Sequence, residues 1–265
     1  MPTPFDADLP RHVMGIWPHP DDEAYLSAGL MARMTDAGRS VTVLTLTRGE
    51  KGTSDPADYD QPHFAAHRER ELRASLAELG VQDIRVVGYR DGECDLVDPE
   101  AAIGRIADVI ASVGPDLLVT FGPDGITGHR DHRIVSAWVT EAWRRVGGTE
   151  LRYATMSDDF VARHADLHDR IGLFAERAVD GPASYPPDQI ALAFELSEVE
   201  LDRKRRALAR HASQTGPLAA LMGEDTYRRW WRTEWFRRPT EQEASSCALC
   251  PPSTAGTRDS IEAPS

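Results

Sequence analysis

Residues 13–26 read VMGIWPHPDDEAYL, an apolar run that meets a polar cluster at a proline. The run 13–18 is short and apolar, which is typical of a buried strand. Leucine and methionine side chains recur at helical intervals over residues 23–38, and Gly38 is a stop signal for a helix. This stretch therefore predicts a strand, a tight turn and a helix, with His-Pro-Asp-Asp-Glu (19–23) in the turn.

The same alternation continues to about residue 157. Apolar or β-branched runs that predict further strands lie at 41–47, 84–89, 116–122 and 151–156, with a weaker one at 191–196. Four helical patterns lie between and after these strands. The first ends near Gly80, the second covers residues 99–113, the third ends at Gly147-Gly148, and the fourth covers residues 197–212. Strands that alternate with helices of ten or more residues form parallel sheets covered on both faces. We therefore expect an α/β fold, a Rossmann-like sandwich with a mainly parallel sheet and a smaller C-terminal subdomain.

Three regions follow from this pattern. Residues 1–157 are expected to form the Rossmann-like core, and residues 158–238 a C-terminal part that completes the core and the rim of a pocket. The stretch 239–265 is rich in Pro, Ser, Glu and Thr and is expected to be a mobile tail. It contains a Cys-x-x-Cys pair, Cys247 and Cys250, without the second pair that a structural zinc site needs.

Composition narrows the class of partner. The 265 residues include 30 Lys and Arg against 43 Asp and Glu, a formal net charge of −13. Nucleic acids and anionic membranes attract basic proteins, so neither is an expected partner. The sequence contains no apolar window of about 18 residues, no secretory signal pattern, and three cysteines, too few for a disulfide framework. We expect a cytoplasmic protein with a small-molecule partner. The sequence leaves open whether the chain forms a homo-oligomer.

Two clusters of histidine and aspartate follow the first and fourth predicted strands. They are His19–Glu23 and His-Arg-Asp-His at 129–132. Taken alone, the first could be a polar helix cap and the second a solvated loop pair. In a doubly wound sheet of order 3-2-1-4-5, however, strands 1 and 4 are neighbours, and ligands bind beyond their carboxyl ends. Imidazole and carboxylate ligands together suit Zn²⁺ or Fe²⁺, so the clusters predict a shared metal site.

These motifs resemble those of the LmbE-like/PIG-L zinc-dependent N-deacetylases, a family that includes mycothiol-type sugar deacetylases and amidases. The family's marks are the His-Pro-Asp-Asp-Glu turn and a downstream His-x-x-His. Other segments also match: TRGEKG at 47–52, REREL at 68–72, Arg90-Asp91 and HASQ at 211–214. The resemblance covers most of residues 12–215.

The resemblance implies a role for seven residues. The metal ligands are His19, Asp22 and His132; Asp21 is the general base and His129 stabilises or protonates the developing charge; Arg68 and Asp91 contact the sugar. Three protein ligands leave zinc an open position for water, whose pKa the metal lowers. A carboxylate beside that water can take its proton, and an imidazole near the carbonyl oxygen can stabilise the oxyanion.

We therefore expect a hydrolase that uses Zn²⁺, or alternatively Fe²⁺, to remove an N-acyl group, in the first place acetyl, from an amino sugar or sugar conjugate. Two alternatives stay open: an amidase for a larger thiol-sugar conjugate, and a non-catalytic member that binds sugar or metal. Asp21 argues against the second, because a pure binder does not need another carboxylate beside the ligands.

Three residues depart from the pattern of the family. Thr127 stands where mycothiol-type deacetylases carry a tyrosine, Trp17 predicts a bulkier pocket floor, and Tyr25 is a further local difference.

Other motifs indicate no second chemistry. The sequence lacks the GxGxxG, GxxxxGK[ST] and GxSxG patterns of dinucleotide sites, P-loops and serine hydrolases. The pairs His63/His67 and His164/His168 lack the zincin glutamate, and we expect solvated helix faces. The aromatic and basic segment 227–238 could bind a membrane surface or a base. In an acidic chain we favour packing on the body or the pocket rim.

Overall fold

The computed structural model describes residues 9–52, 61–174 and 184–245. The strands are β1 (His12–Trp17), β2 (Ser40–Thr47), β3 (Asp83–Tyr89), β4 (Leu117–Phe121), β5 (Glu150–Thr155), β6 (Leu192–Glu195) and β7 (Thr233–Arg237). The α-helices are α2 (Asp22–Asp36), α3 (Gln61–Glu78), α4 (Pro99–Val113), α5 (Arg130–Val146), α6 (Asp158–Arg163), α7 (Ala165–Ile171), α8 (Glu198–Arg210), α9 (Ala212–Met222), α10 (Glu224–Trp230) and α11 (Glu241–Ser245). Two 3₁₀ turns are η1 (Cys94–Leu96) and η2 (Pro187–Gln189).

The strands form one sheet in the order β3-β2-β1-β4-β5-β7-β6. The first five are parallel, with Val13 opposite Val41 on one side and Leu117 on the other. This confirms the α/β class and the predicted order 3-2-1-4-5. Strand β7 runs antiparallel to both β5 and β6. The carboxyl ends of β1 and β4 therefore lie side by side, as the prediction of a shared site requires.

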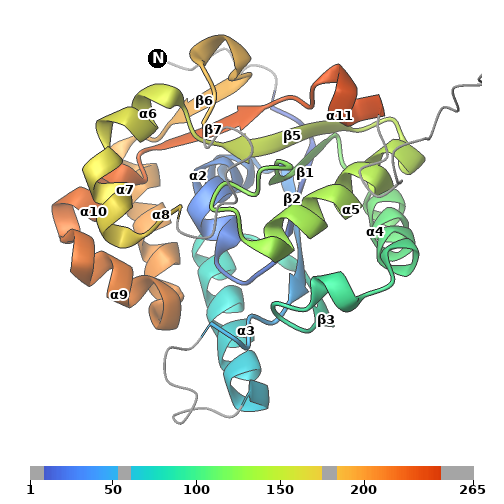
Figure 1. The fold of residues 1–265 in the computed structure, drawn as a ribbon, viewed down its shortest axis with the longest axis horizontal. Coiled ribbons are helices and arrows are strands. Elements are labelled where there is room, and N and C mark those ends of the chain that lie inside the picture. The colour runs from blue at the N-terminus through green and yellow to red at the C-terminus, as the bar shows by residue number, and fades with distance from the viewer. Residues whose placement is uncertain (1–8, 53–60, 175–183, 246–265) are drawn as a thin grey trace, which may run out of the picture.

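Helices cover both faces of the sheet, because successive side chains of each strand point to opposite faces. Val13 and Trp17 of β1 belong to the core that includes side chains of α2, α3 and α8. Met14 and Ile16 belong to a second core, which includes side chains of α4 and α5. Figure 1 shows the resulting layers, with α4 and α5 on one side of the molecule and α7 to α10 gathered on the other.

The segments after residue 158 continue this fold. Strands β6 and β7 extend the same sheet, and α8 packs against α2 and α3. Glu234 of β7 is buried and accepts hydrogen bonds from the backbone N–H groups of Gly29 and Leu30 and from Lys204 of α8. The sequence did not predict β7, because its buried Glu234 and Arg237 interrupt the apolar pattern. Lys204 of α8 is paired with Glu234, and Glu243, six residues further along the chain, is paired with Arg237.

Part of the segment expected to be a mobile tail forms a short helix. Residues 241–245 form α11, and Glu243 makes two hydrogen bonds of 2.8 Å to the buried guanidinium of Arg237. A buried charge on β7 therefore contacts this stretch, and the mobility of the tail stays a prediction. Residues 246–265, with Cys247 and Cys250, lie outside the described residues.

Two surface expectations can be compared with the structure. His63 is exposed and His67 is paired with Glu71, but His168 is buried and accepts a hydrogen bond from Trp230 Nε1 at 3.0 Å. The prediction of a solvated face is wrong for His168, because α10 covers it. In segment 227–238 the aromatic side chains of Trp230 and Phe236 are buried, in agreement with packing on the body. None of the described helices has both the length and the apolar character needed to cross a bilayer.

Candidate metal centre and active site

The turn after β1 places three polar side chains beside one another. Asp22 begins α2, and its Oδ2 accepts a hydrogen bond of 2.9 Å from the backbone N–H of His19. Asp21 precedes the helix with φ 118°, a conformation that residues with a side chain rarely adopt. Its carboxylate makes no capping hydrogen bond; it lies 3.1 Å from Arg68 Nη2. The alternative that the cluster 19–23 is only a polar helix cap therefore does not account for Asp21.

The second cluster lies where α5 begins. His129 caps the helix, and its Nδ1 accepts a hydrogen bond of 3.2 Å from the backbone N–H of Asp131. The buried ring of His132 stacks on Phe121, with 4.0 Å between the ring centroids. Its Nδ1 lies 3.1 Å from the carbonyl oxygen of Gly125, which can accept a hydrogen bond from an N–H at that nitrogen. This bond leaves Nε2 of His132 as the nitrogen with a free lone pair.

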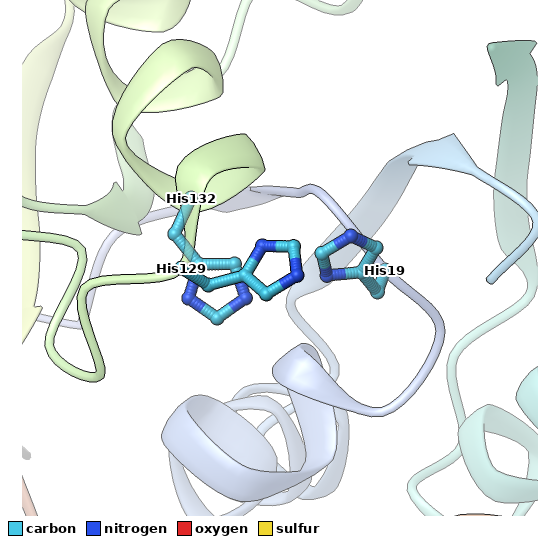
Figure 2. A group of neighbouring side chains, drawn as sticks. All are labelled: His19, His129 and His132. Atoms are coloured by element: carbon cyan, nitrogen blue, oxygen red, sulfur yellow. The ribbon is translucent and has the colours of Figure 1, made fainter. Parts of the chain in front are cut away.

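The two clusters meet at one point. Figure 2 shows the rings of His19, His129 and His132 turned toward one another, one from the turn after β1 and two from the start of α5. Nitrogen atoms of these rings, one from each, lie within 4.8 Å of one another. The carboxylate of Asp22 lies 3.6 Å from His19 Nδ1 through one oxygen and 3.6 Å from His132 Nε2 through the other.

This donor set fits a divalent metal ion. Bonds of about 2.0 to 2.2 Å in tetrahedral geometry place neighbouring zinc ligands about 3.3 to 3.6 Å apart. The contacts of Asp22 with His19 and His132 reach the upper end of that range. Two imidazoles and a carboxylate are also ligands that Zn²⁺ and Fe²⁺ accept. His129 lies close enough to be a further ligand, so the geometry alone allows a second ligand set.

The other nitrogen of His19 faces two carboxylates. Its Nε2 lies 3.1 Å from Asp91 and 3.3 Å from Asp131, while Asp131 also accepts hydrogen bonds from the backbone N–H groups of Gly92 and Cys94. Carboxylates in this position orient a metal-bound histidine and fix its tautomer. Sequence reasoning gave Asp131 no role, although it lies inside the His-Arg-Asp-His motif; only the fold brings it to His19.

Burial and charge shift the pKa values of these groups. Burial lowers the pKa of His132 to about 4, so its imidazole is neutral at physiological pH. Burial would also lower the pKa of His19, but hydrogen bonds with three carboxylates raise it well above its usual value. Burial raises the pKa of Asp21 to about 7, against the opposing charge of Arg68. Carboxylates gathered around one imidazole concentrate negative charge that a dication can balance.

Arg68 lies behind the turn. Its guanidinium donates hydrogen bonds to the carbonyl oxygens of Gly49 and Pro20 and contacts the carboxylate of Asp21. Gly49 has φ +66°, and a Cβ atom there would lie 2.0 Å from Arg68 Nη1. Arg68 was expected to contact the sugar; it lines the cavity, but most of its donors are committed to the protein. Asp91 also lines the cavity, and its oxygens already contact His19 and the backbone N–H of Lys51.

A cavity of about 430 Å³ opens over these residues. Its polar lining residues include Lys51, Gly52, Arg68, Asp91, Gly92 and Gln214. Its apolar lining residues include Tyr25, Leu26, Met156, Leu218, Trp230 and Trp231. Tyr25 and Trp231 pack with ring centroids 4.6 Å apart, and Trp230 meets Trp231 edge to face. The cavity over the predicted site residues is therefore lined both by hydrogen-bonding groups and by aromatic side chains.

The positions of Trp17 and Thr127, two of the local differences seen in the sequence, can be compared with the lining of the cavity. Trp17 does not line it; Trp17 packs edge to face beneath Phe121, which does. Thr127 lines it, and its hydroxyl lies 3.5 Å from His132 Nδ1. His211 is fully buried outside the lining and contacts Glu23.

Known proteins resemble the chain in these regions. The model of the family described as PIG-L: GlcNAc-PI de-N-acetylase matches residues 14–143, which include both clusters. A 1D-myo-inositol 2-acetamido-2-deoxy-alpha-D-glucopyranoside deacetylase of Kineococcus radiotolerans is 30% identical over 251 residues, 78% of this chain and 70% of the relative. The chain belongs to the PIG-L family. As a PIG-L protein it is expected to be an enzyme, since its relatives are named as deacetylases.

Two further comparisons cover more than four fifths of the chain. A probable N-acetyl-alpha-D-glucosaminyl L-malate deacetylase 2 of Bacillus cereus is 29% identical over 225 residues, 83% of this chain and 89% of the relative. The structure of N,N'-diacetylchitobiose deacetylase from Pyrococcus horikoshii matches with a TM-score of 0.61 and 22% identity. It covers 89% of this chain and 86% of that one. The chain therefore shares the fold of this deacetylase along most of its length.

Proposed function

We propose that the chain is a metal-dependent deacetylase that hydrolyses the N-acetyl amide of an amino sugar or amino-sugar conjugate. The observation that carries this proposal is the position of Asp21. The carboxylate of Asp21 makes no capping hydrogen bond and is not one of the proposed metal ligands. In this PIG-L chain it nevertheless lines the same cavity as those ligands. A helix cap or a pure binding site would not need it.

His19, Asp22 and His132 would hold the metal ion. When bound there, a divalent ion supplies Lewis-acid polarisation of the amide carbonyl and a lowered pKa of water. The donor set supports Zn²⁺ and also accepts Fe²⁺. The carboxylates of Asp91 and Asp131 hold the ring of His19 so that Nδ1 faces Asp22.

Asp21 would act as the general base. It takes a proton from the attacking water as the new C–O bond forms at the amide carbon. The C–N bond then breaks, and the proton passes to the leaving nitrogen, which gives the free amine and acetic acid. The acid transfers its own proton to the amine or to water and leaves as acetate. Arg68 holds the carboxylate through the 3.1 Å contact and so fixes its direction into the cavity.

His129 would stabilise the oxyanion. Its Nδ1 accepts the N–H of Asp131, so a neutral ring carries its proton on Nε2. That N–H can donate to the carbonyl oxygen as negative charge develops on it.

His129→Gln tests this role against the alternative of a metal ligand. Loss of one oxyanion donor costs about 10²- to 10³-fold in kcat. We therefore expect a kcat at least about 100-fold lower, with metal content and metal affinity unchanged, measured by elemental analysis and chelator competition. A variant that loses its metal would show instead that His129 belongs to the ligand set.

The charges of the cavity favour a neutral substrate. Among the described residues that line it, Lys51 and Arg68 are the arginine and lysine side chains. Arg68 is committed to the turn, and Lys51 pairs with Glu93 at 2.9 Å. The sugar hydroxyls would lie against the polar lining residues. Because Lys51 and Arg68 are both paired within the protein, neither would pair with an anionic aglycone.

The substrate experiment compares two N-acetylglucosaminides, one linked to neutral inositol and one to malate, by acetate release and by mass detection of the amine. We expect a kcat/KM at least about tenfold higher for the inositol compound, a difference of about 1.4 kcal/mol in transition-state binding. In Glu93→Gln, which frees Lys51, the malate compound should gain. Preference of the wild-type protein for malate would contradict the charge argument, and absence of acetate release from any N-acetylated amino sugar would contradict the proposed function.

A further inference from the structure

A buried pair, Glu23 and His211, lies next to the catalytic turn but outside the cavity. Both side chains are fully buried. Nε2 of His211 lies 2.9 Å from one carboxylate oxygen of Glu23, and the other oxygen accepts the backbone N–H of Asp21 at 2.9 Å. In the described part of the chain, Nδ1 of His211 has no hydrogen-bond partner, so Glu23 is the polar contact of the ring.

Asp21 needs such support. A residue with a side chain is strained at φ 118°, and this conformation persists where the surroundings hold it. The carbonyl oxygen of Asp21 accepts the N–H groups of Ala24 and Tyr25 at 2.9 and 3.0 Å, as a helix start does. The N–H of Asp21 has no partner within the helix, and Glu23 supplies one.

The C-terminal half of the chain fixes His211. The residue lies between α8 and α9, and its carbonyl oxygen accepts the N–H groups of Gln214 and Thr215. These helices pack on the body, so the ring reaches Glu23 across 188 positions of sequence. Movement of Glu23 away from Asp21 would leave the imidazole buried without a partner, which is costly.

We propose that Glu23 and His211 are positioning residues that hold the strained Asp21 turn and so aim its carboxylate into the cavity. The proposal rests on the proposed function for its kinetic consequence. Neither residue lines the cavity, so both act through Asp21. An apolar pair of the same volume would serve stability at least as well as a buried ionisable pair. The distinctive contribution of the polar pair is an oriented acceptor for the N–H of Asp21.

The test compares His211→Ala, which removes the contact, with His211→Gln, whose amide N–H can replace Nε2. A misplacement of about 1 Å at a catalytic group can cost about 10²-fold in rate. We expect kcat of His211→Ala to fall about 10- to 100-fold, with KM within about threefold and metal content unchanged. His211→Gln should recover most of kcat. Tyr153→Phe is the matched control, because it removes a buried hydrogen bond to Thr140 away from the cavity and should keep wild-type kcat.

Three results would overturn the proposal: wild-type kcat in a folded His211→Ala, equal losses in the Ala and Gln variants, or loss of metal in His211→Ala. If His211→Ala does not fold, the comparison moves to His211→Asn, whose shorter amide cannot reach Glu23. The Asn variant should then be impaired and the Gln variant active, and equal activity of the two would reject the proposal.

A structural measurement separates this proposal from the proposed function. Crystal structures of the wild type, His211→Ala and His211→Gln would give the φ angle of Asp21 in each. We expect a positive φ in the wild type and the Gln variant and a relaxed, negative φ in the Ala variant. An unchanged φ in His211→Ala would contradict the positioning role even if no substrate were yet known.

Discussion

Asp21→Asn is expected to lower kcat about 10³-fold while the protein keeps its metal. The amide has nearly the same size as the carboxylate and can still contact Arg68, but it cannot take a proton from water. General bases contribute about 10²- to 10⁴-fold to such reactions. The measurement is the rate of acetate release at saturating substrate, together with KM and metal content, and we expect KM to change less than about threefold.

Asp36→Asn is the matched control for this variant. Asp36 ends the same helix and is paired with Arg203 on the surface, away from the cavity. It should keep wild-type kcat. Full activity of Asp21→Asn would contradict the proposed mechanism, and loss of metal from it would mean that Asp21 is a ligand instead of the base.

Asp22→Ala and His132→Ala are expected to lose both the metal and the activity. Each change removes one of the three proposed metal ligands. Each also removes the charged or hydrogen-bonding partner of the buried side chains that contact it. We expect kcat at the background of the assay and a metal affinity at least about 100-fold weaker, measured by chelator competition. Added metal should restore little activity, since the open position needed for chemistry depends on the full ligand set.

His63→Ala is the control for nonspecific metal binding by histidine, because His63 is exposed on α3. It should bind metal as the wild type does. If His132→Ala retained stoichiometric metal and activity while His129→Ala lost both, the ligand set would have to be revised to one that includes His129.

The parallel half of the fold was predictable from sequence. Runs such as 41–47 and 116–122 consist mostly of apolar or β-branched residues, and glycines mark the ends of the helices between them, so local signals and tertiary structure agree. Strand β7 was not predictable, because Glu234 and Arg237 stand in buried positions. Their partners, Lys204 and Glu243, lie on the separate helices α8 and α11, and no pattern in the strand itself indicates these contacts.

The site, like the fold, was only partly predictable from the sequence. The clusters at 19–23 and 129–132 were predicted to meet, because both follow neighbouring strands, and the structure brings them together. The contact between His19 and Asp131 could not be read from the sequence, since it depends on the position of each ring and carboxylate. The pairing of Glu23 with His211 joins two segments 188 residues apart, and no local pattern links them.

The central claim is that metal bound at His19, Asp22 and His132 makes this chain an amino-sugar deacetylase. The most direct measurement is the titration of metal-free protein with Zn²⁺, and in parallel with Fe²⁺ under anaerobic conditions, while acetate release from an N-acetylglucosaminide is followed. We predict that activity is absent without metal and rises linearly to a plateau at one metal ion per chain. Full acetate release by the metal-free protein, or binding of one metal ion without any acetate release, would contradict the claim.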